Sequence, residues 1–255
     1  MMLVLAIILS MLANTRKIGL LFSIASMFLF LNMMYSWTRS ALVGTFMGLV
    51  FFTPFVWKKR PDLKRRYMAV ILSLLLVFGA VNLLQGSSYM ERIASIFGNA
   101  GLVLQDHSES GSAGSHRWEL WELAFPLVGK YPIFGSGPDT LAFVFDQDAY
   151  CKAIDIPNCQ VDKAHNEYLQ IAITMGIPSL LFYLLFLGTV CHRIWISIWK
   201  SRGEKQLLLA GLLTVIIGYT VQAFFNISVV PVAPYFWLLL GMGYRLAQDV
   251  EGRQS

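Results

Sequence analysis

One short segment of the sequence, DKAHNEYLQ at residues 162–170, combines a histidine with carboxylate and amide side chains. The histidine, His165, stands directly before a run of apolar residues. An imidazole there could act as a general base or orient a hydroxyl nucleophile. Asp162 and Glu167 are near enough in sequence to orient the ring. The other role open to His165 is to anchor the start of a helix through hydrogen bonds.

Two arginines could recognise an anionic substrate. Arg39 lies in SWTRSAL, in a tight turn between two apolar runs, and Arg117 lies in HRWELW. The planar guanidinium group is suited to phosphate or diphosphate. Alternatively, Arg39 reaches lipid headgroups, and Arg117 forms an ion pair with Glu119, Glu122 or another acid of its loop.

Other polar motifs are less specific. The GSGP sequence containing Gly135 and Gly137 neither follows a strand nor opens a helix, which argues against a dinucleotide site. We expect a tight turn there that approaches a ligand or the membrane face. Asp146 and Asp148 resemble a metal-binding DxD pair, but we interpret them as part of a solvated acidic loop. The four histidines lack zinc-ligand spacing, so the sequence predicts neither a metal nor a cofactor.

The elements that must position these residues are membrane helices. The chain is 56% hydrophobic and 14% charged, whereas soluble domains carry roughly 25% charged residues. About 20 apolar residues suffice to cross a bilayer. The fold class is therefore all-α, a polytopic integral membrane protein of about six to seven transmembrane helices. Six spans are predicted, at residues 18–37, 40–57, 67–84, roughly 169–191, 206–225 and 229–244.

A seventh apolar run, residues 1–13, is too short to span. It lacks the basic flank and cleavage site of a signal peptide. We expect it to be the end of a helix that starts upstream, which would make the chain a fragment or a short form.

Short basic clusters alternate with the predicted spans. The positive-inside rule places these clusters and the C-terminus in the cytoplasm, with 14 Lys and Arg inside and 6 outside. The net charge of +5 therefore indicates topology and contact with lipid headgroups rather than nucleic acid. The clusters are Arg16 with Lys17, KKRPDLKRR at 58–66, and Lys200 with Arg202 and Lys205.

Three regions follow from this topology: N-terminal transmembrane helices at 1–84, a large outer loop at 85–165, and C-terminal transmembrane helices at 166–255. The loop carries 5 basic and 10 acidic residues. It faces an oxidising compartment, where a disulfide between Cys151 and Cys159 is plausible. Within it we expect a short amphipathic helix at 87–97, a linker at 108–115, a helix beginning near 116, a turn at 131–140 and irregular structure at 141–161.

Taken in order, four motifs resemble the C-terminal half of the O-antigen ligase and polymerase superfamily. They are SWTRSA after a span, HRWELW, FGSGPDT, and DKAHNEYLQIAITMGIPSLLFY. That family has an Arg-Ser turn, an Arg-x-x-Trp helix, a G-x-G-P turn and His-Asn-Glu-Tyr-Leu in the same order. The resemblance covers roughly residues 30–200. Family members usually have ten or more spans, so four or five N-terminal ones are absent here.

The resemblance implies a metal-independent, inverting membrane glycosyltransferase of cell-surface polysaccharide biosynthesis. Such enzymes move a glycan from a polyprenyl-diphosphate carrier, such as undecaprenyl diphosphate, to an acceptor hydroxyl at the outer face of the bacterial cytoplasmic membrane. The donor, a glycan or lipid acceptor and membrane lipids are the expected partners. The family's essential groups map onto Arg39, Arg117 and His165. Further substrate contacts are expected at Gly135, Gly137, Asn166 and Glu167.

Two other classes stay open from the sequence. A polysaccharide or lipid transporter usually buries charged groups in its spans, and the predicted spans hold almost none. An inactive fragment or noncatalytic scaffold is the other alternative. Ligase and polymerase are not distinguished, because loop surfaces choose the acceptor.

Overall fold

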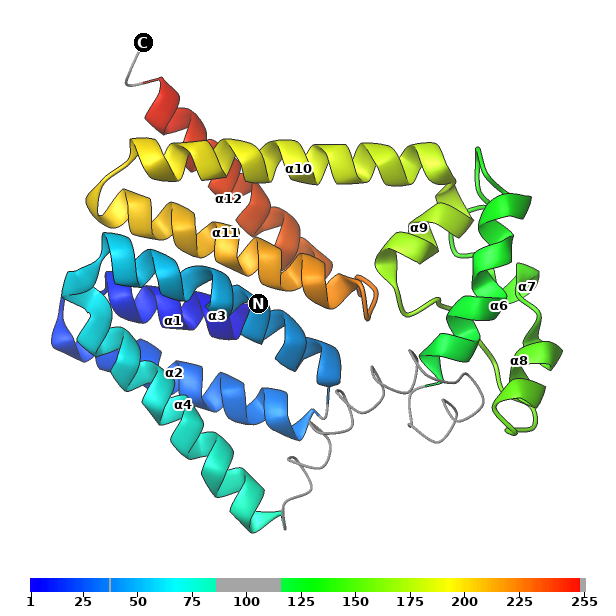
Figure 1. The fold of residues 1–255 in the computed structure, drawn as a ribbon, viewed down its shortest axis with the longest axis horizontal. Helices are drawn as coiled ribbons and strands as arrows, with labels where there is room; N and C mark the ends of the chain where they lie inside the picture. Colours follow the sequence, from blue (N-terminus) through cyan, green and yellow to red (C-terminus); the bar gives the residue numbers. More distant parts are fainter. Residues whose placement is uncertain (37, 86–115, 253–255) are drawn as a thin grey trace. The chain divides into compact units, whose positions relative to one another are not determined.

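A computed structural model describes residues 1–36, 38–85 and 116–252 of the chain, and every regular element in these ranges is a helix (Figure 1). The chain forms two compact units, each described by itself. Unit 1 comprises residues 1–87, 187–222 and 229–255, and unit 2 comprises residues 88–186 and 223–228.

Unit 1 consists of long apolar helices. Its elements are α1 (Met2–Leu12), α2 (Arg16–Tyr35), α3 (Arg39–Lys59), the short 3₁₀ helix η1 (Pro61–Leu63), α4 (Lys64–Leu84), the second half of α10 (Ile177–Lys200), α11 (Gly203–Ala223) and α12 (Ala233–Glu251).

Glycines allow α3 and α11 to pack closely. A Cβ atom added at Gly44 would lie 2.4 Å from the carbonyl oxygen of Gly218, and one added at Gly218 would lie 2.8 Å from that of Gly44. One turn further along α3, Gly48 faces the Thr214 carbonyl oxygen in the same way. Membrane helices commonly pack through small residues at this spacing, because their backbones can then approach each other.

The three basic segments lie at one end of the helices of unit 1. Arg60 donates to the carbonyl oxygen of Gly203 at 3.0 Å, which joins the α3–α4 and α10–α11 connections. Arg66 donates to the carbonyl oxygen of Ala13 at 3.2 Å, next to the start of α2. If basic clusters alternate with spans, all three clusters must lie on the same side of the membrane, as they do here. That this side is the cytoplasmic one stays a prediction.

Among the described residues, five helical segments are long and apolar enough to cross a membrane, so the predicted count of six to seven is not confirmed. The 19-residue α12, predicted as the last span, is not one of them and carries Arg245, Asp249 and Glu251. The five are Arg16–Tyr35, Arg39–Lys59, Pro61–Leu84, Ile177–Lys200 and Gly203–Ala223.

The predicted span at 169–191 is wrong. Helix α9 (Glu167–Met175) ends at Gly176, where φ is +87°, and α10 begins at Ile177. Hydropathy is continuous across this point and does not report the break, although Gly176 and Pro178 are residues that commonly interrupt a helix. Because α10 extends to Lys200, it includes Arg193, whose Nε donates to Glu251 of α12 at 3.1 Å.

Unit 2 contains α6 (Arg117–Lys130), α7 (Leu141–Val144), α8 (Gln147–Ala153), α9 and the start of α10. The predicted helix near 116 and the Gly/Pro turn are confirmed, but residues 141–161 are partly helical rather than irregular. The predicted helix at 87–97 and linker at 108–115 lie outside the described residues. The core of unit 2 is formed by Leu120, Ala124, Leu141, Phe145, Tyr150, Val161, Ala164 and Ile173.

Candidate functional site

Two hydrogen bonds between side chains and the backbone of Ala164, the residue before His165, hold the backbone at this position. Ala164 accepts a hydrogen bond from the indole Nε1 of Trp121 at 2.8 Å and donates its N–H to the side-chain oxygen of Gln170 at 2.8 Å. His165 itself has φ +49°, a left-handed conformation that non-glycine residues seldom adopt. Both hydrogen-bonding groups of Ala164 are therefore satisfied by side chains of α6 and α9.

On the other side of His165, Asn166 starts helix α9. Its side-chain oxygen accepts from the N–H of Leu169 at 3.1 Å, a standard N-cap bond, and only 6% of the residue is exposed. The helix start is thus anchored by Asn166, which leaves the exposed His165 side chain available for another role. Asn166 was predicted to contact substrate, and no observation tests that prediction.

Glu167 ties α9 to the segment at residues 223–228. One carboxylate oxygen accepts from the backbone N–H of Ser228 at 2.6 Å and the other from its hydroxyl at 2.8 Å. The Tyr183 hydroxyl of α10 donates to the same carboxylate at 3.4 Å. These bonds give Glu167 a structural role, and its predicted contact with substrate stays a prediction.

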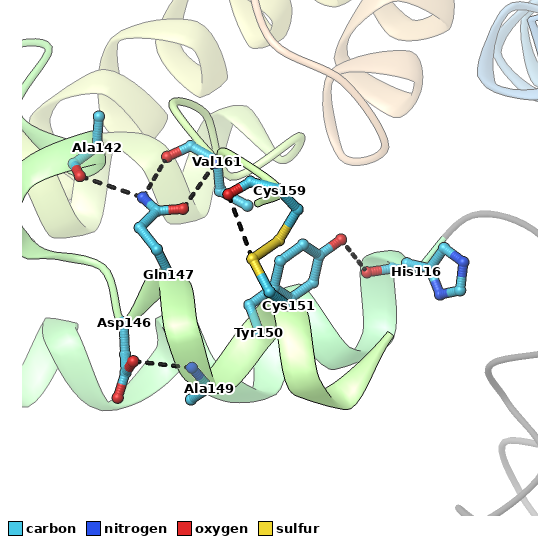
Figure 2. Close-up of a disulfide and its surroundings, with 9 residues drawn as sticks. All are labelled: His116, Ala142, Asp146, Gln147, Ala149, Tyr150, Cys151, Cys159 and Val161. Carbon is cyan, nitrogen blue, oxygen red and sulfur yellow. Dashed lines mark hydrogen bonds between the residues drawn. A yellow bond between two sulfur atoms is a disulfide. The ribbon is translucent and has the colours of Figure 1, made fainter. Parts of the chain in front are cut away.

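The segment that leads to His165 is also held at its beginning (Figure 2). The Gln147 side chain donates to the Val161 carbonyl oxygen and accepts from the Val161 N–H, both at 2.8 Å. One turn along α8, Cys151 forms a disulfide with Cys159, a pairing that the sequence left open, with Cα atoms 5.5 Å apart. Residues 159–161 are therefore fastened to α8 by one covalent link and two hydrogen bonds.

The electrostatic surroundings of His165 favour the neutral imidazole. Although the side chain reaches solvent, partial burial of the ring and, to a smaller extent, the positive charge of Arg117 lower its pKa, and the negative charge of Asp162 partly opposes them. Arg117 is the first residue of α6 and is partly buried. His165 and Arg117 both belong to unit 2, and the charge of Arg117 acts on the imidazole. The catalytic roles of both residues stay predictions. A neutral imidazole is the form that can accept a proton.

Arg39, the third predicted residue, is the first residue of α3 and belongs to unit 1. Its participation with His165 and Arg117 stays a prediction.

A family model described as O-antigen ligase matches residues 24–184, a range that includes Arg39, Arg117 and His165. The chain belongs to the O-antigen ligase family. No curated protein matches the chain. Family membership, together with five long apolar helices, identifies a multi-pass membrane protein of the O-antigen ligase type, a class of membrane glycan enzymes.

In this O-antigen ligase-type protein the GSGP turn caps the end of α9. The N–H groups of Ser136 and Gly137 donate to the carbonyl oxygens of Ile173 and Thr174 at 2.8 and 3.0 Å. Gly135 has φ +70°, and a Cβ atom there would lie 2.2 Å from the Thr174 carbonyl carbon. The turn needs glycine for this close approach, and the predicted substrate contacts of Gly135 and Gly137 stay untested.

The DxD sequence is part of the scaffold. Asp146 caps α8 by accepting from the N–H of Ala149 at 2.9 Å, and the Gln147 between the two aspartates holds Val161. Across the described part of the chain, no group of three or more His, Cys, Asp and Glu side chains could hold a metal ion.

Sequence reasoning missed three residues that support His165: Trp121, Gln147 and Gln170. The side chain of each forms a hydrogen bond with a backbone group 6 to 43 positions away in the chain. Such a bond cannot be predicted from a local sequence pattern. The only sequence signals were that Trp121 belongs to the HRWELW motif and Gln170 to the histidine segment.

Proposed function

We propose that this protein transfers a glycan from a polyprenyl-diphosphate carrier to an acceptor hydroxyl at the outer face of the bacterial cytoplasmic membrane. His165 accepts or orients the proton of the acceptor hydroxyl. Arg117 and Arg39 bind the diphosphate. The reaction is metal-independent and inverts the anomeric carbon.

The observation that carries this proposal is the arrangement at the start of α9. The family-matched region presents an exposed imidazole under the influence of the Arg117 charge. Its neighbours Ala164, Asn166 and Glu167 are occupied by hydrogen bonds of the scaffold. His165 is therefore the residue of this motif whose side chain is offered to a substrate.

Arginines suit the chemistry of the leaving group. Negative charge builds up on the diphosphate as the bond between the sugar C1 and the phosphate oxygen breaks. Cationic donors positioned at that oxygen lower the barrier, and one preorganised donor commonly contributes about 3 kcal/mol. The acceptor oxygen, relieved of its proton by His165, attacks C1 from the opposite face, which inverts the configuration.

Two further features support the location and the donor class. The Cys151–Cys159 disulfide in unit 2 fits an oxidising compartment outside the cytoplasm. In unit 1, an apolar groove of about 1020 Å³ between α3 and α4, which extends to Arg65 at the basic end of these helices, offers space for the distal part of an isoprenoid tail. Residues lining it include Phe46, Leu49, Trp57, Leu72 and Leu75.

The proposal is tested by complementation of a strain that lacks its own ligase or polymerase, with surface polysaccharide followed on gels. Wild type is compared with His165→Ala, Arg117→Ala and Arg39→Ala. Lys152→Ala, which removes an exposed cation of α8, is the matched control. Transfer by wild type and the control, with loss in the three site variants at equal membrane abundance, supports the assignment.

Transfer that persists in His165→Ala would contradict the role of His165. A purified assay with a defined lipid-diphosphate donor addresses the stereochemistry and the metal. Product with the same anomeric configuration as the donor would disprove inversion, and loss of activity on chelation would disprove metal independence.

A further inference from the structure

The turn at residues 131–134, between α6 and the GSGP sequence, contacts the first residue of α10, one of the helices long and apolar enough to cross a membrane. The N–H of Ile177, where α10 begins, donates to the carbonyl oxygen of Pro132 at 2.8 Å. A Cβ atom at the preceding Gly176 would lie 2.1 Å from the carbonyl oxygen of Ile133. The position of this turn relative to α10 is therefore fixed by direct backbone contact.

The side chains of this turn are apolar and strongly exposed. Phe134 is 88% exposed and Ile133 is 61% exposed. The adjoining first turns of α10 expose Leu181, Phe182 and Leu185 in the same manner, as expected of a helix surface in contact with lipid. Ile133 and Phe134 therefore add exposed apolar side chains to a turn whose backbone contacts the start of α10.

The length of α10 sets the depth of the turn. Twenty-four residues at about 1.5 Å each span about 36 Å, and the hydrocarbon core of a bilayer is about 30 Å thick. A helix of this length can place its first residue at the boundary between headgroups and hydrocarbon, together with the turn bonded to it.

The flanking residues are those that favour this boundary. Lys130 ends α6, and its ammonium lies 5.3 Å from the centre of the Tyr131 ring. Tyrosine is enriched in the headgroup layer, and lysine there reaches lipid phosphates while its methylenes stay in apolar surroundings.

We propose that residues 131–134, the anchor turn, insert into the interfacial layer of the bilayer at the N-terminal end of α10. Ile133 and Phe134 enter the apolar layer, and Lys130 stays among the headgroups. The anchor turn then holds the end of α6 at the membrane face. This inference requires α10 to cross the membrane and is independent of the proposed glycan transfer.

The test measures the depth of a nitroxide label at position 134. The full chain carries Cys191→Ser, with the native disulfide retained, and Phe134→Cys is labelled and reconstituted into vesicles of phosphatidylethanolamine and phosphatidylglycerol. Collisions with oxygen, which concentrates in the bilayer, are compared with collisions with a water-soluble nickel chelate. Leu184→Cys, exposed on α10, is the lipid reference.

Ile156→Cys is the matched aqueous control. Ile156 is an exposed aliphatic residue that follows α8, and α8 lies at the opposite end of unit 2 from the start of α10 (Figure 1). We expect the ratio of oxygen to nickel collisions at position 134 to be severalfold above that at 156 and close to that at 184. A ratio equal to that at 156 would overturn the proposal.

A label at Ile133→Cys, in a chain that keeps Phe134, is the control for the possibility that replacing Phe134 itself moves the turn. It too is expected to give the lipid-like ratio. Low collision rates with both reagents at both positions would show that protein, such as a second copy of the chain, covers the turn instead of lipid, and would equally overturn the proposal.

Discussion

Trp121 and Ala164 are joined by a hydrogen bond in which the indole N–H donates to the carbonyl oxygen at 2.8 Å. Ala164 directly precedes His165, so the bond fixes the backbone from which the imidazole projects. The indole ring also packs edge-on against Phe224, with ring centres 5.7 Å apart. Trp121 therefore links α6, the histidine segment and the segment at 223–228 within unit 2.

Replacing Trp121 by Phe keeps an aromatic ring but removes the hydrogen bond. A neutral bond of this kind contributes about 1 kcal/mol, so we expect the free energy of unfolding of unit 2 to fall by about that amount. We expect kcat for glycan transfer to fall about tenfold or more, because small displacements of a reacting group are costly. Steady-state kinetics on purified protein test this prediction. Phe125→Leu, at a strongly exposed position of the same helix, should leave kcat unchanged.

Glu167 is expected to stabilise the 223–228 segment because its two oxygens accept bonds from Ser228. Glu167→Gln removes the charge and turns an amide N–H₂ toward one of these donors. Hydrogen bonds to charged groups contribute about 1.5–3 kcal/mol, so we expect a loss of about 2 kcal/mol and faster amide hydrogen exchange at residues 224–232. Glu122→Gln, on an exposed position of α6, is the control. Unchanged exchange in Glu167→Gln would contradict the structural role.

The disulfide is expected to stabilise the segment that leads to His165. Loop-closure entropy for a crosslink with a sequence separation of 8 corresponds to about 2.5 kcal/mol. The double variant Cys151→Ser and Cys159→Ser should therefore lower the stability of unit 2 by about that amount. It should also weaken the hydrogen bonds between Gln147 and the backbone of Val161. Thermal unfolding and glycan transfer, each with and without reductant, test this. The double variant should not respond to reductant, whereas Cys191→Ser, which removes the free thiol but keeps the disulfide, should behave like wild type with and without reductant.

Local patterns were sufficient to predict several features. The Gly/Pro cluster predicted the turn, the Trp-rich segment predicted α6, and the positions of Cys151 and Cys159 in an acidic loop predicted to lie outside the cytoplasm were compatible with their disulfide. His165 stood out because it is the one histidine at the mouth of an apolar helix. Each of these depends on residues close together in the chain.

What the sequence could not supply depends on residues far apart. Trp121 and Ala164 are 43 positions apart, and Glu167 and Ser228 are 61 apart. The break at Gly176 escapes prediction for a different reason, since hydropathy averages over a window and gives too little weight to the helix-breaking residues Gly176 and Pro178. The hydrophobic run at 169–191 therefore predicted one helix where there are two.

The pH dependence of His165 has a definite sign. Desolvation and Arg117 lower its pKa, so the neutral base persists to lower pH than for an ordinary histidine. Arg117→Gln should raise this pKa, and Asp162→Asn should lower it further, because Asp162 opposes the other two effects. Histidine NMR titration, assigned with His165→Gln, tests both shifts without requiring activity. Shifts of the same sign in the two variants would contradict the arrangement.

The same lowered pKa affects stability. Between the lowered and the ordinary pKa, the unfolded chain binds a proton at His165 more readily than the folded chain does. The fold therefore loses stability from this group as pH falls through that window, and the effect is absent at higher pH. Denaturation at several pH values should show a shallower acid loss in His165→Gln than in wild type.

Gly135 and Gly129 form a matched pair that tests the close approach of the GSGP turn to α9. At Gly135, a Cβ atom would lie 2.2 Å from the Thr174 carbonyl carbon, and φ is +70°. At Gly129, in α6, a Cβ atom would meet nothing within 4 Å. Gly135→Ala should therefore cost more than about 2 kcal/mol, since backbone atoms must move.

Gly129→Ala should instead stabilise the protein by about 0.5–1 kcal/mol, because alanine is favoured over glycine within a helix. Thermal unfolding of both variants in the same detergent measures the difference, and hydrogen exchange at 173–177 locates it. Because Gly135→Ala displaces the end of α9, it should also loosen the bond between Ile177 and Pro132. Equal stability of the two variants would mean that the turn does not rest on α9 in this way.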